Sequence, residues 1–350
     1  MTSGGAAPRV LLLCGGRSEE HEVSLASARS VLEAAGGTLD VMPRVIDRRG
    51  RLLAAEASRR ALAGEADAGE ASGAAEGDEL AGALARLTSD GVDVVFPLLH
   101  GPYGEDGSVQ GLLRLLGVPF VGSDVLASSV AMDKLMMKAV FAAHGFPQVG
   151  YGAVRRDDWT RDREASLAAL ETLPWPRFVK PANLGSSIGV RRVDTAAAQR
   201  EAVEDAFRFD RRVIVEEGVD PARELEVAVL GNDAPAVSPV GEIRYRADFY
   251  DYDTKYTDGR AELLIPAPVP ASVAERARTL AESAFRALDG AGLARVDFLY
   301  RAENDALLLN EVNTIPGFTR HSMYPKLWEA AGVPYPELIR RLIALGLERR

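Results

Sequence analysis

The chain has 350 residues, of which 47% are hydrophobic and 26% charged, a composition that excludes a mainly disordered, collagen-like or coiled-coil protein. At about 150 residues per domain, this length predicts roughly two or three domains. The net charge of −10 at pH 7 argues against nonspecific binding to nucleic acid or to a membrane surface.

The cysteine content and the apolar pattern both bear on the compartment. Cys14 is the only cysteine, so no intrachain disulfide can form, which fits a reducing compartment. The N-terminus, MTSGGAAPRV, has neither the charged nor the apolar region of a signal peptide. No apolar run approaches the ~20 residues that span a bilayer. We therefore expect a cytoplasmic protein.

The first part of the chain alternates predicted strands with predicted helices. Arg9–Cys14 (RVLLLC) is an apolar run typical of a buried strand, and Glu22–Ala35 predicts a helix. Residues 54–90 are rich in Ala, Gly and Glu and predict a helix, an exposed loop and a second helix near 80–87. Further strands are predicted at 39–46, 92–96 and 118–121, and a further helix at 108–116. This alternation predicts a parallel sheet with right-handed crossovers.

Two further units follow from about Gly122 and Asp220. The second opens with a long predicted helix, 128–144, which contains MDKLMMK. Its predicted strands are 149–154, 177–180, 190–193 and 212–217, and its helices 163–173 and 196–209. The third unit has predicted strands at 223–230, 234–241, 262–265, 293–300 and 306–313, a helix at 271–288 and two C-terminal helices.

The predicted hairpin of residues 293–313 carries the most specific chemical pattern. Side chains alternate faces along a strand, so Arg295 and Asp297 share one side, as do Glu311 and Asn313. If both pairs face one cleft, they offer two carboxylates, an amide oxygen and a guanidinium. Carboxylate and amide oxygens are ligands that Mg²⁺ prefers, together with substrate phosphates. The alternative is an exposed hairpin with ordinary surface charges.

Lysine is rare in this chain, and the segment FVKPANLGSSIGV (178–190) carries one. Only five of the 41 basic residues are lysine. Lys180 leads from a predicted strand into a loop whose glycines and hydroxyls can approach an anion, and lysine supplies positive charge for phosphate. The spacing does not match GxxxxGK[ST], and a plain Gly/Ser turn is the alternative.

Four other regions could complete a site. The strand end in RVIVEEGVDPARELEV (212–227) offers carboxylates to a ribose, although such a turn is more often solvated. GGRSEEHEVS (15–24) places a Gly turn before a helix N-terminus, which attracts anions. LLHGPYGEDG (98–107) contains His100, which is a candidate ligand, base or buried structural histidine. The loop ADFYDYDTKYTDG (247–259) could close over a site or be an ordinary surface loop.

Seven motifs occur in the order typical of D-alanine–D-alanine ligases of the ATP-grasp superfamily, and the chain resembles that family from about residue 9 onward. They are GGRSEEHEVS, HGPYGEDG, MDKLMMK, VKPANLGSSIGV, YDYDTKY, ARVDF and NEVNTIPGFTRHSMYP. The resemblance implies an α/β (α+β overall) ATP-grasp fold. Its parts would be an N-terminal Rossmann-like parallel-sheet domain (1–122), a small central α/β domain (123–217) and a C-terminal domain with a largely antiparallel sheet (218–350). The last would hold the catalytic hairpin and a mobile loop, 247–259.

The resemblance also implies the reaction: ATP-dependent ligation of two D-alanine molecules through a D-alanyl phosphate, for peptidoglycan precursor synthesis. The implied cofactors are two Mg²⁺ (or Mn²⁺) ions and a monovalent cation such as K⁺. The implied partners are ATP, D-alanine and a second copy of the chain in a homodimer, with no nucleic acid and no membrane.

For the nucleotide and the metals, roles carry over only at positions that match the motifs. The implied phosphate contacts are Lys134, Lys180 and Lys255. The implied adenine contacts are Glu216, Glu217 and Val219, with Glu224 at the ribose. The implied metal ligands are Asp297, Glu311 and Asn313, with Glu311 bridging the two ions.

For the amino acids, the resemblance implies contacts at both substrates. Glu20 would bind the ammonium of the first D-alanine, with His100 nearby. Arg295 and the Gly317 backbone would surround the reacting carboxylate, and Ser322 and Met323 would hold the carboxylate of the second D-alanine. Ser186 and Tyr256 would link to Glu20 and tie the mobile loop to the site.

Three alternatives make different predictions. A ligase that joins D-alanine to D-lactate or D-serine is one, although Tyr256 favours an amine nucleophile, because related D-lactate ligases tend to carry another residue there. Another ATP-grasp ligase would keep Lys180 and the metal ligands but not the combination of Glu20, Ser186 and Tyr256. A two-lobed sugar- or amino-acid-binding protein has no use for the acidic cluster. Phosphate release that requires both ATP and D-alanine separates a D-alanine ligase from another ATP-grasp ligase and from a binding protein.

Overall fold

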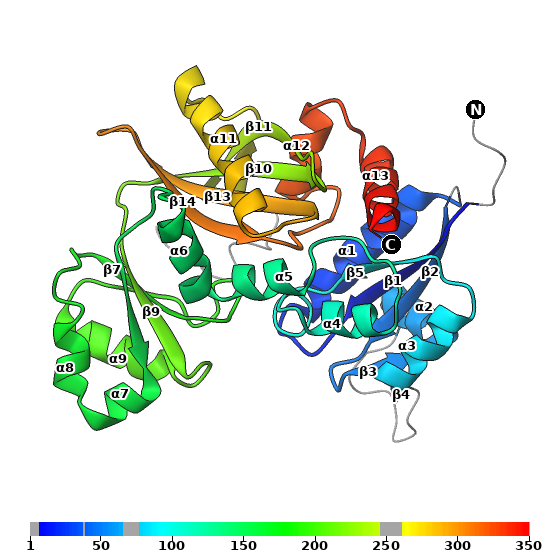
Figure 1. Cartoon of the computed structure of the whole chain (residues 1–350), viewed down its shortest axis with the longest axis horizontal. Helices are drawn as coiled ribbons and strands as arrows, with labels where there is room; N and C mark the ends of the chain where they lie inside the picture. Colours follow the sequence, from blue (N-terminus) through cyan, green and yellow to red (C-terminus); the bar gives the residue numbers. More distant parts are fainter. Residues whose placement is uncertain (1–6, 38, 66–76, 246–260, 350) are drawn as a thin grey trace.

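The computed structural model describes residues 7–37, 39–65, 77–245 and 261–349, which form three β-sheets flanked by helices (Figure 1). The N-terminal sheet and the central four-stranded sheet lie at opposite ends of the long axis. The sheet of C-terminal strands lies between them and above (Figure 1). This mixed α/β architecture, with one sheet built on parallel strands and two antiparallel sheets, confirms the predicted fold class.

The N-terminal sheet has the strand order β4-β3-β2-β1-β5. Its strands are β1 (Arg9–Gly15), β2 (Asp40–Ile46), β3 (Arg51–Leu53), β4 (Gly77–Glu79) and β5 (Val94–Leu98). The apolar run of β1 is buried on both faces and pairs in parallel with β2 and β5, as predicted. The antiparallel strands β3 and β4 were not predicted. Of the strand predicted at 118–121, the structure shows only a single parallel bridge from Phe120 to Val95.

Four helices cover this sheet: α1 (His21–Ala35), α2 (Ala55–Ala63), α3 (Leu80–Ser89) and α4 (Ser108–Leu115). Helix α1 ends at Gly36, which adopts a left-handed conformation and donates its N–H to the Leu32 carbonyl. The loops that leave the carboxyl ends of β1 and β5 carry Glu20 and His100. In an α/β sheet these ends are where ligands bind.

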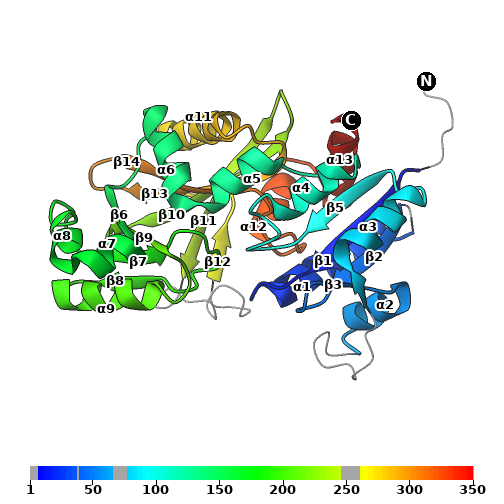
Figure 2. The same cartoon turned by 60° about the horizontal axis from the view of Figure 1, so that its bottom comes forward.

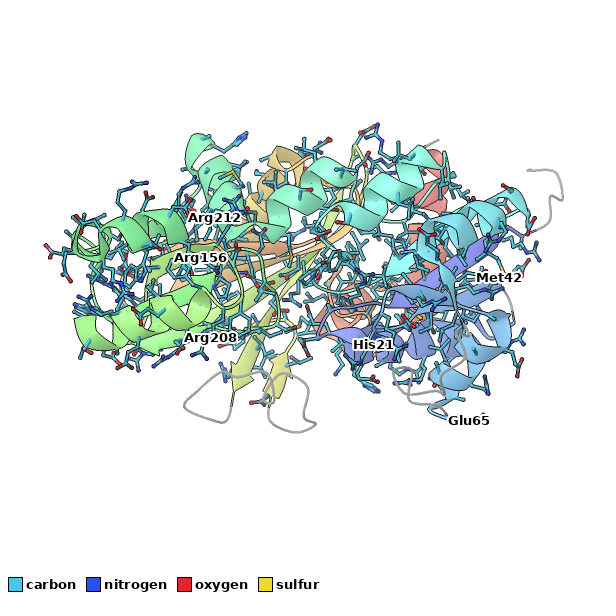
Figure 3. The ribbon with its side chains drawn as sticks, turned by 90° about the horizontal axis from the view of Figure 1, so that it is seen from below. His21, Met42, Glu65, Arg156, Arg208 and Arg212 are labelled. Atoms are coloured by element: carbon cyan, nitrogen blue, oxygen red, sulfur yellow. The ribbon has the colours of Figure 1, made fainter. Side chains whose placement is uncertain are left out.

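The single helix predicted at 128–144 is wrong, because the structure has two helices there. Helix α5 (Val125–Met132) stops at Asp133 and α6 (Lys134–Ala143) starts immediately after it. Asp133 has extended backbone and its carboxylate accepts the N–H groups of Leu135 and Met136, both at 3.1 Å, as an N-cap does. The same carboxylate pairs with Arg212 of the central unit (labelled in Figure 3). After the break α6 runs in a different direction from α5 (Figure 2). Its start packs on the central unit, and its buried face then packs on the C-terminal sheet.

The central sheet is antiparallel throughout, in the order β6-β9-β7-β8. Its strands are β6 (Tyr151–Arg155), β7 (Arg177–Pro181), β8 (Arg191–Val193) and β9 (Arg212–Glu217), and its helices α7 (Arg156–Arg161), α8 (Arg163–Ala168) and α9 (Ala196–Ala206). Helix α8 is shorter than the predicted 163–173. The loop between β7 and β8 carries the Gly/Ser motif.

The C-terminal sheet is also antiparallel, in the order β12-β11-β10-β13-β14. Its strands are β10 (Arg223–Gly231), β11 (Ala236–Tyr245), β12 (Ala261–Leu264), β13 (Gly292–Arg301) and β14 (Ala306–Asn313), and the helices that follow or flank them are α11 (Ala271–Ala287), α12 (Met323–Ala330) and α13 (Tyr335–Glu348). The predicted hairpin at 293–313 is β13 and β14.

The hydrophobic cores show which parts are built together. One core joins residues of β1 and β5 to residues of β10, α12 and α13. At its centre the ring of Phe318 packs against Phe96 and Tyr335, with centroids 5.6 Å apart in both pairs. The central unit has a separate core of its own. Within the described residues, no helix has the length and apolar character needed to cross a membrane.

Candidate active site

The hairpin β13–β14 brings the predicted metal ligands onto one face of the sheet. Asp297 lies directly opposite Glu311, and Arg295 directly opposite Asn313. A bulge next to Asp297 ends this register, so the four residues form a local block at the end of the hairpin. On the other side, Asp297 lies opposite Glu226 of β10. Three carboxylates thus lie in a row across three strands.

Arg295 holds this row together. Its Nε and Nη2 donate to the two carboxylate oxygens of Asp297, both at 2.7 Å, and its Nε lies 3.2 Å from Glu226 Oε2. The Asn313 amide donates to Asp297 at 2.9 Å. Burial lowers the pKa of Arg295, but the Asp297 and Glu226 carboxylates outweigh it and hold that pKa well above its usual value.

This donor set fits a hard divalent cation that is shared with a substrate. Like charges on directly opposite positions repel each other, so Asp297 and Glu311 favour a cation between them. Among the described residues, no three His, Cys, Asp or Glu side chains cluster as a complete metal site. The predicted set has only two carboxylates and the Asn313 amide, which leaves the other positions to phosphate oxygens and water, as Mg²⁺ usually has them.

A lysine cluster lies in the central unit. Glu216 of β9 is buried and binds two lysines, with Oε1 3.0 Å from Lys138 Nζ and Oε2 2.5 Å from Lys180 Nζ. Burial raises the pKa of Glu216, but the two lysines overcome it and lower that pKa to about 2. Lys134 donates from Nζ to the Leu184 carbonyl in the Gly/Ser loop at 2.5 Å. Two lysines against one carboxylate leave this cluster with net positive charge.

The lysine cluster and the acidic row lie close enough to interact. Burial lowers the pKa of Lys134, while the charge of Glu311 raises it. Burial also lowers the pKa of Lys180, but Glu216, Glu311 and Glu224 outweigh that effect and raise it. Positive groups from α6 and the central sheet therefore lie near carboxylates of the C-terminal sheet, which is the arrangement a metal-bound polyphosphate requires.

A third group comes from the N-terminal sheet. Glu20 precedes α1 and is buried, and its Oε1 accepts a hydrogen bond from the Ser186 hydroxyl, 166 residues away in the Gly/Ser loop. Two glycines make room for this carboxylate. A Cβ at Gly101 would lie 2.5 Å from Glu20 Oε2, and one at Gly185 3.0 Å away. Gly101 also has a φ of +72°, which favours glycine.

His100 and Glu105 connect this group to the C-terminal part. His100 is buried and its Nδ1 lies 3.0 Å from the carbonyl of Ile315. Glu105 accepts the N–H of Gly101 at 2.7 Å and that of Ile315 at 3.3 Å. Burial lowers the pKa of His100. Burial, followed by the charge of Glu20, raises the pKa of Glu105 to about 8.

The remaining predicted substrate residues follow β14. Ser322 Oγ accepts the N–H of Thr319 at 3.1 Å, and a Cβ at Gly317 would lie 3.3 Å from the same oxygen. The Gly317 backbone and the Ser322 side chain are therefore neighbours. Met323 begins α12 and is buried beside Gly241 of β11.

The predicted nucleotide residues 216–224 run from the end of β9 in the central sheet to the start of β10 in the C-terminal sheet. The Glu217 carboxylate accepts the N–H of Gly150 at 3.3 Å, Val219 is buried, and Glu224 is the second residue of β10. The Glu216 side chain points at the two lysines, so its carboxylate is already engaged. Lys255, Tyr256 and the predicted mobile loop 247–259 lie outside the described residues.

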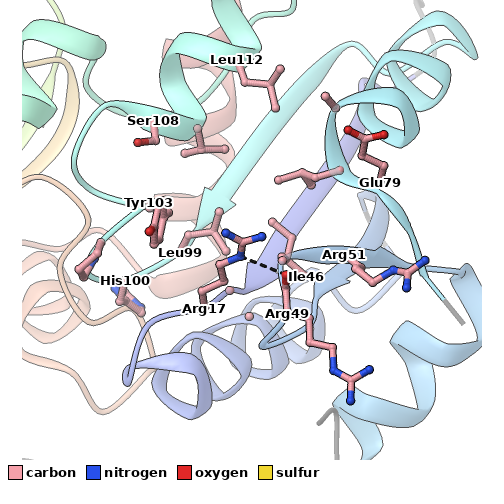
Figure 4. A pocket seen from close by; sticks show the side chains of 18 residues that line it. Arg17, Ile46, Arg49, Arg51, Glu79, Leu99, His100, Tyr103, Ser108 and Leu112 are labelled. Atoms are coloured by element: carbon pink, nitrogen blue, oxygen red, sulfur yellow. Dashed lines mark hydrogen bonds between the residues drawn. The ribbon is translucent and has the colours of Figure 1, made fainter. Parts of the chain in front are cut away.

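A cavity of about 530 Å³ lies in the N-terminal unit, with His100 in its wall (Figure 4). Its floor is largely apolar, with Ile46, Leu99 and Leu112, and Arg17 donates to the Arg49 carbonyl at its edge at 3.1 Å. This cavity lies in the N-terminal unit, away from the lysine cluster and the acidic row. Among the predicted site residues, His100 lines it.

Three residues of the site were not predicted: Lys138, Glu226 and Glu105. Lys138 is one of the five lysines and lies one helical turn after Lys134 on α6, a spacing that places both on one face. Glu226 lies two residues after Glu224 on β10 and so shares its face. Glu105 is part of the HGPYGEDG motif, and only its side-chain contacts distinguish it from Asp106.

Comparison with known proteins covers nearly the whole chain. Family models described as the N-terminus and the C-terminus of D-ala D-ala ligase match residues 9–123 and 140–344. A D-alanine–D-alanine ligase of Deinococcus radiodurans is 54% identical over 345 residues, which are 98% of this chain and 99% of the relative. One from Geobacillus kaustophilus is 46% identical over 350 residues, 97% of this chain and 95% of the relative.

Solved structures agree. The VanG D-Ala:D-Ser ligase of Enterococcus faecalis superposes with a TM-score of 0.80 at 32% identity, over 97% of this chain and 100% of that chain. The D-alanine-D-alanine ligase of Coxiella burnetii superposes with a TM-score of 0.78 at 35% identity, over 98% and 94%.

Proposed function

The chain belongs to the D-alanine–D-alanine ligase family, and from that membership we propose how its residues divide the work of the reaction. The enzyme uses ATP to join two D-alanine molecules into D-alanyl-D-alanine for peptidoglycan synthesis. The observation that supports the assignment of roles is the convergence of three groups: Glu20 with Ser186, the lysines around Glu216, and the row held by Arg295.

The chemistry needs an activated carboxylate, because a free carboxylate is a poor acylating agent. An oxygen of the first D-alanine's carboxylate attacks the γ-phosphorus of ATP and ADP leaves, which gives D-alanyl phosphate. The neutral amine of the second D-alanine then attacks the carbonyl carbon, and phosphate leaves as the peptide bond forms. Water must be kept out meanwhile, because it would hydrolyse the acyl phosphate.

Lysines bind the phosphates of ATP in this proposal. Lys134 and Lys180, with Lys255 from the loop, contact the phosphate oxygens and offset their negative charge. The Glu216 carboxylate holds Lys180 in place, in addition to the adenine contact expected of that stretch. Glu217 and Val219 face the adenine, and Glu224 accepts from the ribose hydroxyls.

The acidic row holds the metals in this proposal. Asp297, Glu311 and Asn313 would hold two Mg²⁺ (or Mn²⁺) ions. When bound, these ions would neutralise the charge of the phosphates during transfer. A monovalent cation such as K⁺ is a further proposal, tested by replacing K⁺ with Na⁺ in the assay.

The amino acids bind between the three units. Glu20, fixed by Ser186, binds the ammonium of the first D-alanine, with His100 close by. Arg295 and the Gly317 N–H stabilise the negative charge that develops on the carbonyl oxygen, and one such donor typically contributes roughly 3–4 kcal/mol to catalysis. Ser322 and Met323 hold the carboxylate of the second D-alanine, and Tyr256 ties the loop to Glu20.

We also propose the domain bounds 1–122, 123–217 and 218–350, a homodimer and a cytoplasmic location. Sedimentation of the purified protein tests the dimer.

Product analysis tests the proposed reaction. Purified protein, ATP and Mg²⁺ are incubated with D-alanine alone, and with D-alanine together with D-serine or D-lactate, and the products are identified by mass spectrometry. We expect D-alanyl-D-alanine as the main product and phosphate release only when ATP and D-alanine are both present. Mainly mixed products with D-serine or D-lactate would replace this proposal with the alternative ligase specificity.

A further inference from the structure

Side chains of the N-terminal unit hold the main chain of residues 315–320, the segment that follows the metal-binding end of β14. The bonds run from Ile315 N–H to Glu105 (3.3 Å), from His100 Nδ1 to the Ile315 carbonyl (3.0 Å), from Phe318 N–H to Ser27 (3.4 Å) and from Arg320 N–H to Ser30 (2.9 Å). Gly317 lies in the middle of this segment. The N-terminal unit therefore fixes the backbone around Gly317 from several sides.

The donor and acceptor roles in this hydrogen-bond network can be assigned consistently. The carbonyl of Ile315 can only accept, so His100 Nδ1 must carry the proton. Because burial lowers the pKa of His100, the ring is neutral and its Nε2 accepts. Nε2 lies 3.3 Å from the Ser27 hydroxyl, which donates to it and in turn accepts the N–H of Phe318. Each group uses its donor and its acceptor once.

Glu105 joins its own loop to Ile315, which lies 210 residues further along the chain. One carboxylate oxygen accepts the N–H of Gly101 at 2.7 Å, and the other that of Ile315 at 3.3 Å. An ionised carboxylate serves both donors, whereas a protonated one keeps a hydroxyl on one oxygen. Burial, and after it the charge of Glu20, opposes ionisation of Glu105, and an ammonium bound at Glu20 would remove the second of these effects. Binding of the first substrate would therefore favour the ionised form, which accepts both N–H groups.

We infer that Glu105 is a positioning residue for this reaction: together with His100 it clamps the Ile315 peptide and so aims the N–H of Gly317 at the carbonyl that reacts. This inference rests on the proposed role of Gly317. It gives the N-terminal unit a function beyond holding the ammonium of D-alanine, because the donor that stabilises the oxyanion is supplied by one unit and aligned by another.

The substitution Glu105→Gln tests the inference with little change in size. The amide keeps one acceptor but turns its NH₂ toward a backbone N–H, so one of the two bonds is lost. A misplaced donor of this kind costs about 10- to 100-fold in rate. We therefore expect kcat to fall about 10- to 100-fold, while the KM for ATP changes less than about twofold, because the lysine cluster lies in the central unit. Glu56→Gln, at an exposed carboxylate of the same unit, serves as the control and should keep wild-type kinetics.

A pair of His100 variants gives a second readout that does not depend on Glu105. The Asn side chain in His100→Asn places a donor near the position of Nδ1 and keeps the bond to Ile315, whereas Gln in His100→Gln reaches toward Ser27 instead. We expect the Asn variant to retain more of kcat than the Gln variant. Thermal unfolding shows whether each variant is folded, and this pair decides the question if Glu105→Gln does not fold.

The outcomes separate the inference from the reaction on which it rests. Wild-type protein that released no phosphate with ATP and D-alanine would overturn the proposed reaction. An active wild type together with unchanged kcat in Glu105→Gln, or equal kcat in the two His100 variants, would overturn only the positioning role. A lower kcat in Glu105→Gln with an unchanged KM for ATP, and the order Asn above Gln at position 100, support it.

Discussion

Replacement of Lys138 by methionine should lower both the stability of the central unit and its affinity for ATP. Lys138 is buried on α6, 1% exposed, and its ammonium lies 3.0 Å from the Glu216 carboxylate, which Lys180 binds from the other side at 2.5 Å. Methionine has nearly the same volume but no charge. Glu216 then keeps one partner, and Lys180 is drawn more firmly to it and away from the phosphates.

The magnitude follows from the pKa of Glu216. The difference between about 2 in the folded protein and the ordinary 4.5 corresponds to about 3 kcal/mol of net stabilisation, which is the effect of both lysines less the opposing effect of burial. We assign roughly half of this, on the order of 1–2 kcal/mol, to Lys138. Because the pKa of this carboxyl is lowered on folding, the contribution is complete above pH 4.5 and is lost as the pH falls toward 2.

Thermal and acid unfolding of wild type and Lys138→Met, followed by circular dichroism, measure this term. We expect a lower melting temperature at pH 7 and a smaller difference between the two proteins near pH 2. Steady-state kinetics should show a KM for ATP raised about 10-fold or more. The control Arg286→Met removes an exposed ion pair with Glu282, which contributes only about 0.3–0.5 kcal/mol. Equal melting temperatures and an unchanged KM for ATP in Lys138→Met would refute the reasoning.

Three further substitutions test other parts of the site. Ser186→Ala removes the hydroxyl that fixes Glu20, so the KM for the first D-alanine should rise about 10-fold; normal steady-state kinetics would contradict this. Asp297→Asn removes a proposed metal ligand, and we expect kcat to fall at least about 100-fold with a higher Mg²⁺ requirement; wild-type turnover at low Mg²⁺ would exclude that role. Tyr256→Phe should raise depsipeptide formation relative to dipeptide when D-alanine and D-lactate compete, and an unchanged product ratio would remove the argument for Tyr256.

Most of the fold could be predicted because its elements have strong local patterns. The apolar run of β1, the alternating pattern of β13 and the periodic pattern of α11 each identify their element. The three-residue strands β3 and β4 were missed, since so short a segment has no periodicity. The break at Asp133 was missed because MDKLMMK has good helix formers on both sides. Only the contact with Arg212 and the capping bonds show that the helix stops there.

Much of the site could be named from the sequence, but its contacts could not. Ordered motifs identified Glu20, Lys180 and Asp297 without reference to distance. The pairing of Glu216 with Lys138 depends on how α6 packs on the central sheet, and the contact of Glu105 with Ile315 depends on two chain segments meeting from different sheets. Long-range contacts of this kind leave no local pattern in the sequence. Lys138 and Glu105 could therefore be identified only from the coordinates.

The separate core of the central unit has a consequence for how the molecule responds to heat and to nucleotide. Because the apolar residues of this unit pack among themselves, calorimetry of the free protein should resolve its melting from that of the part built on Phe96, Phe318 and Tyr335. A nucleotide bound by Lys180 on one side and Asp297 on the other would connect these two parts. The two melting transitions would then merge into one at a higher temperature.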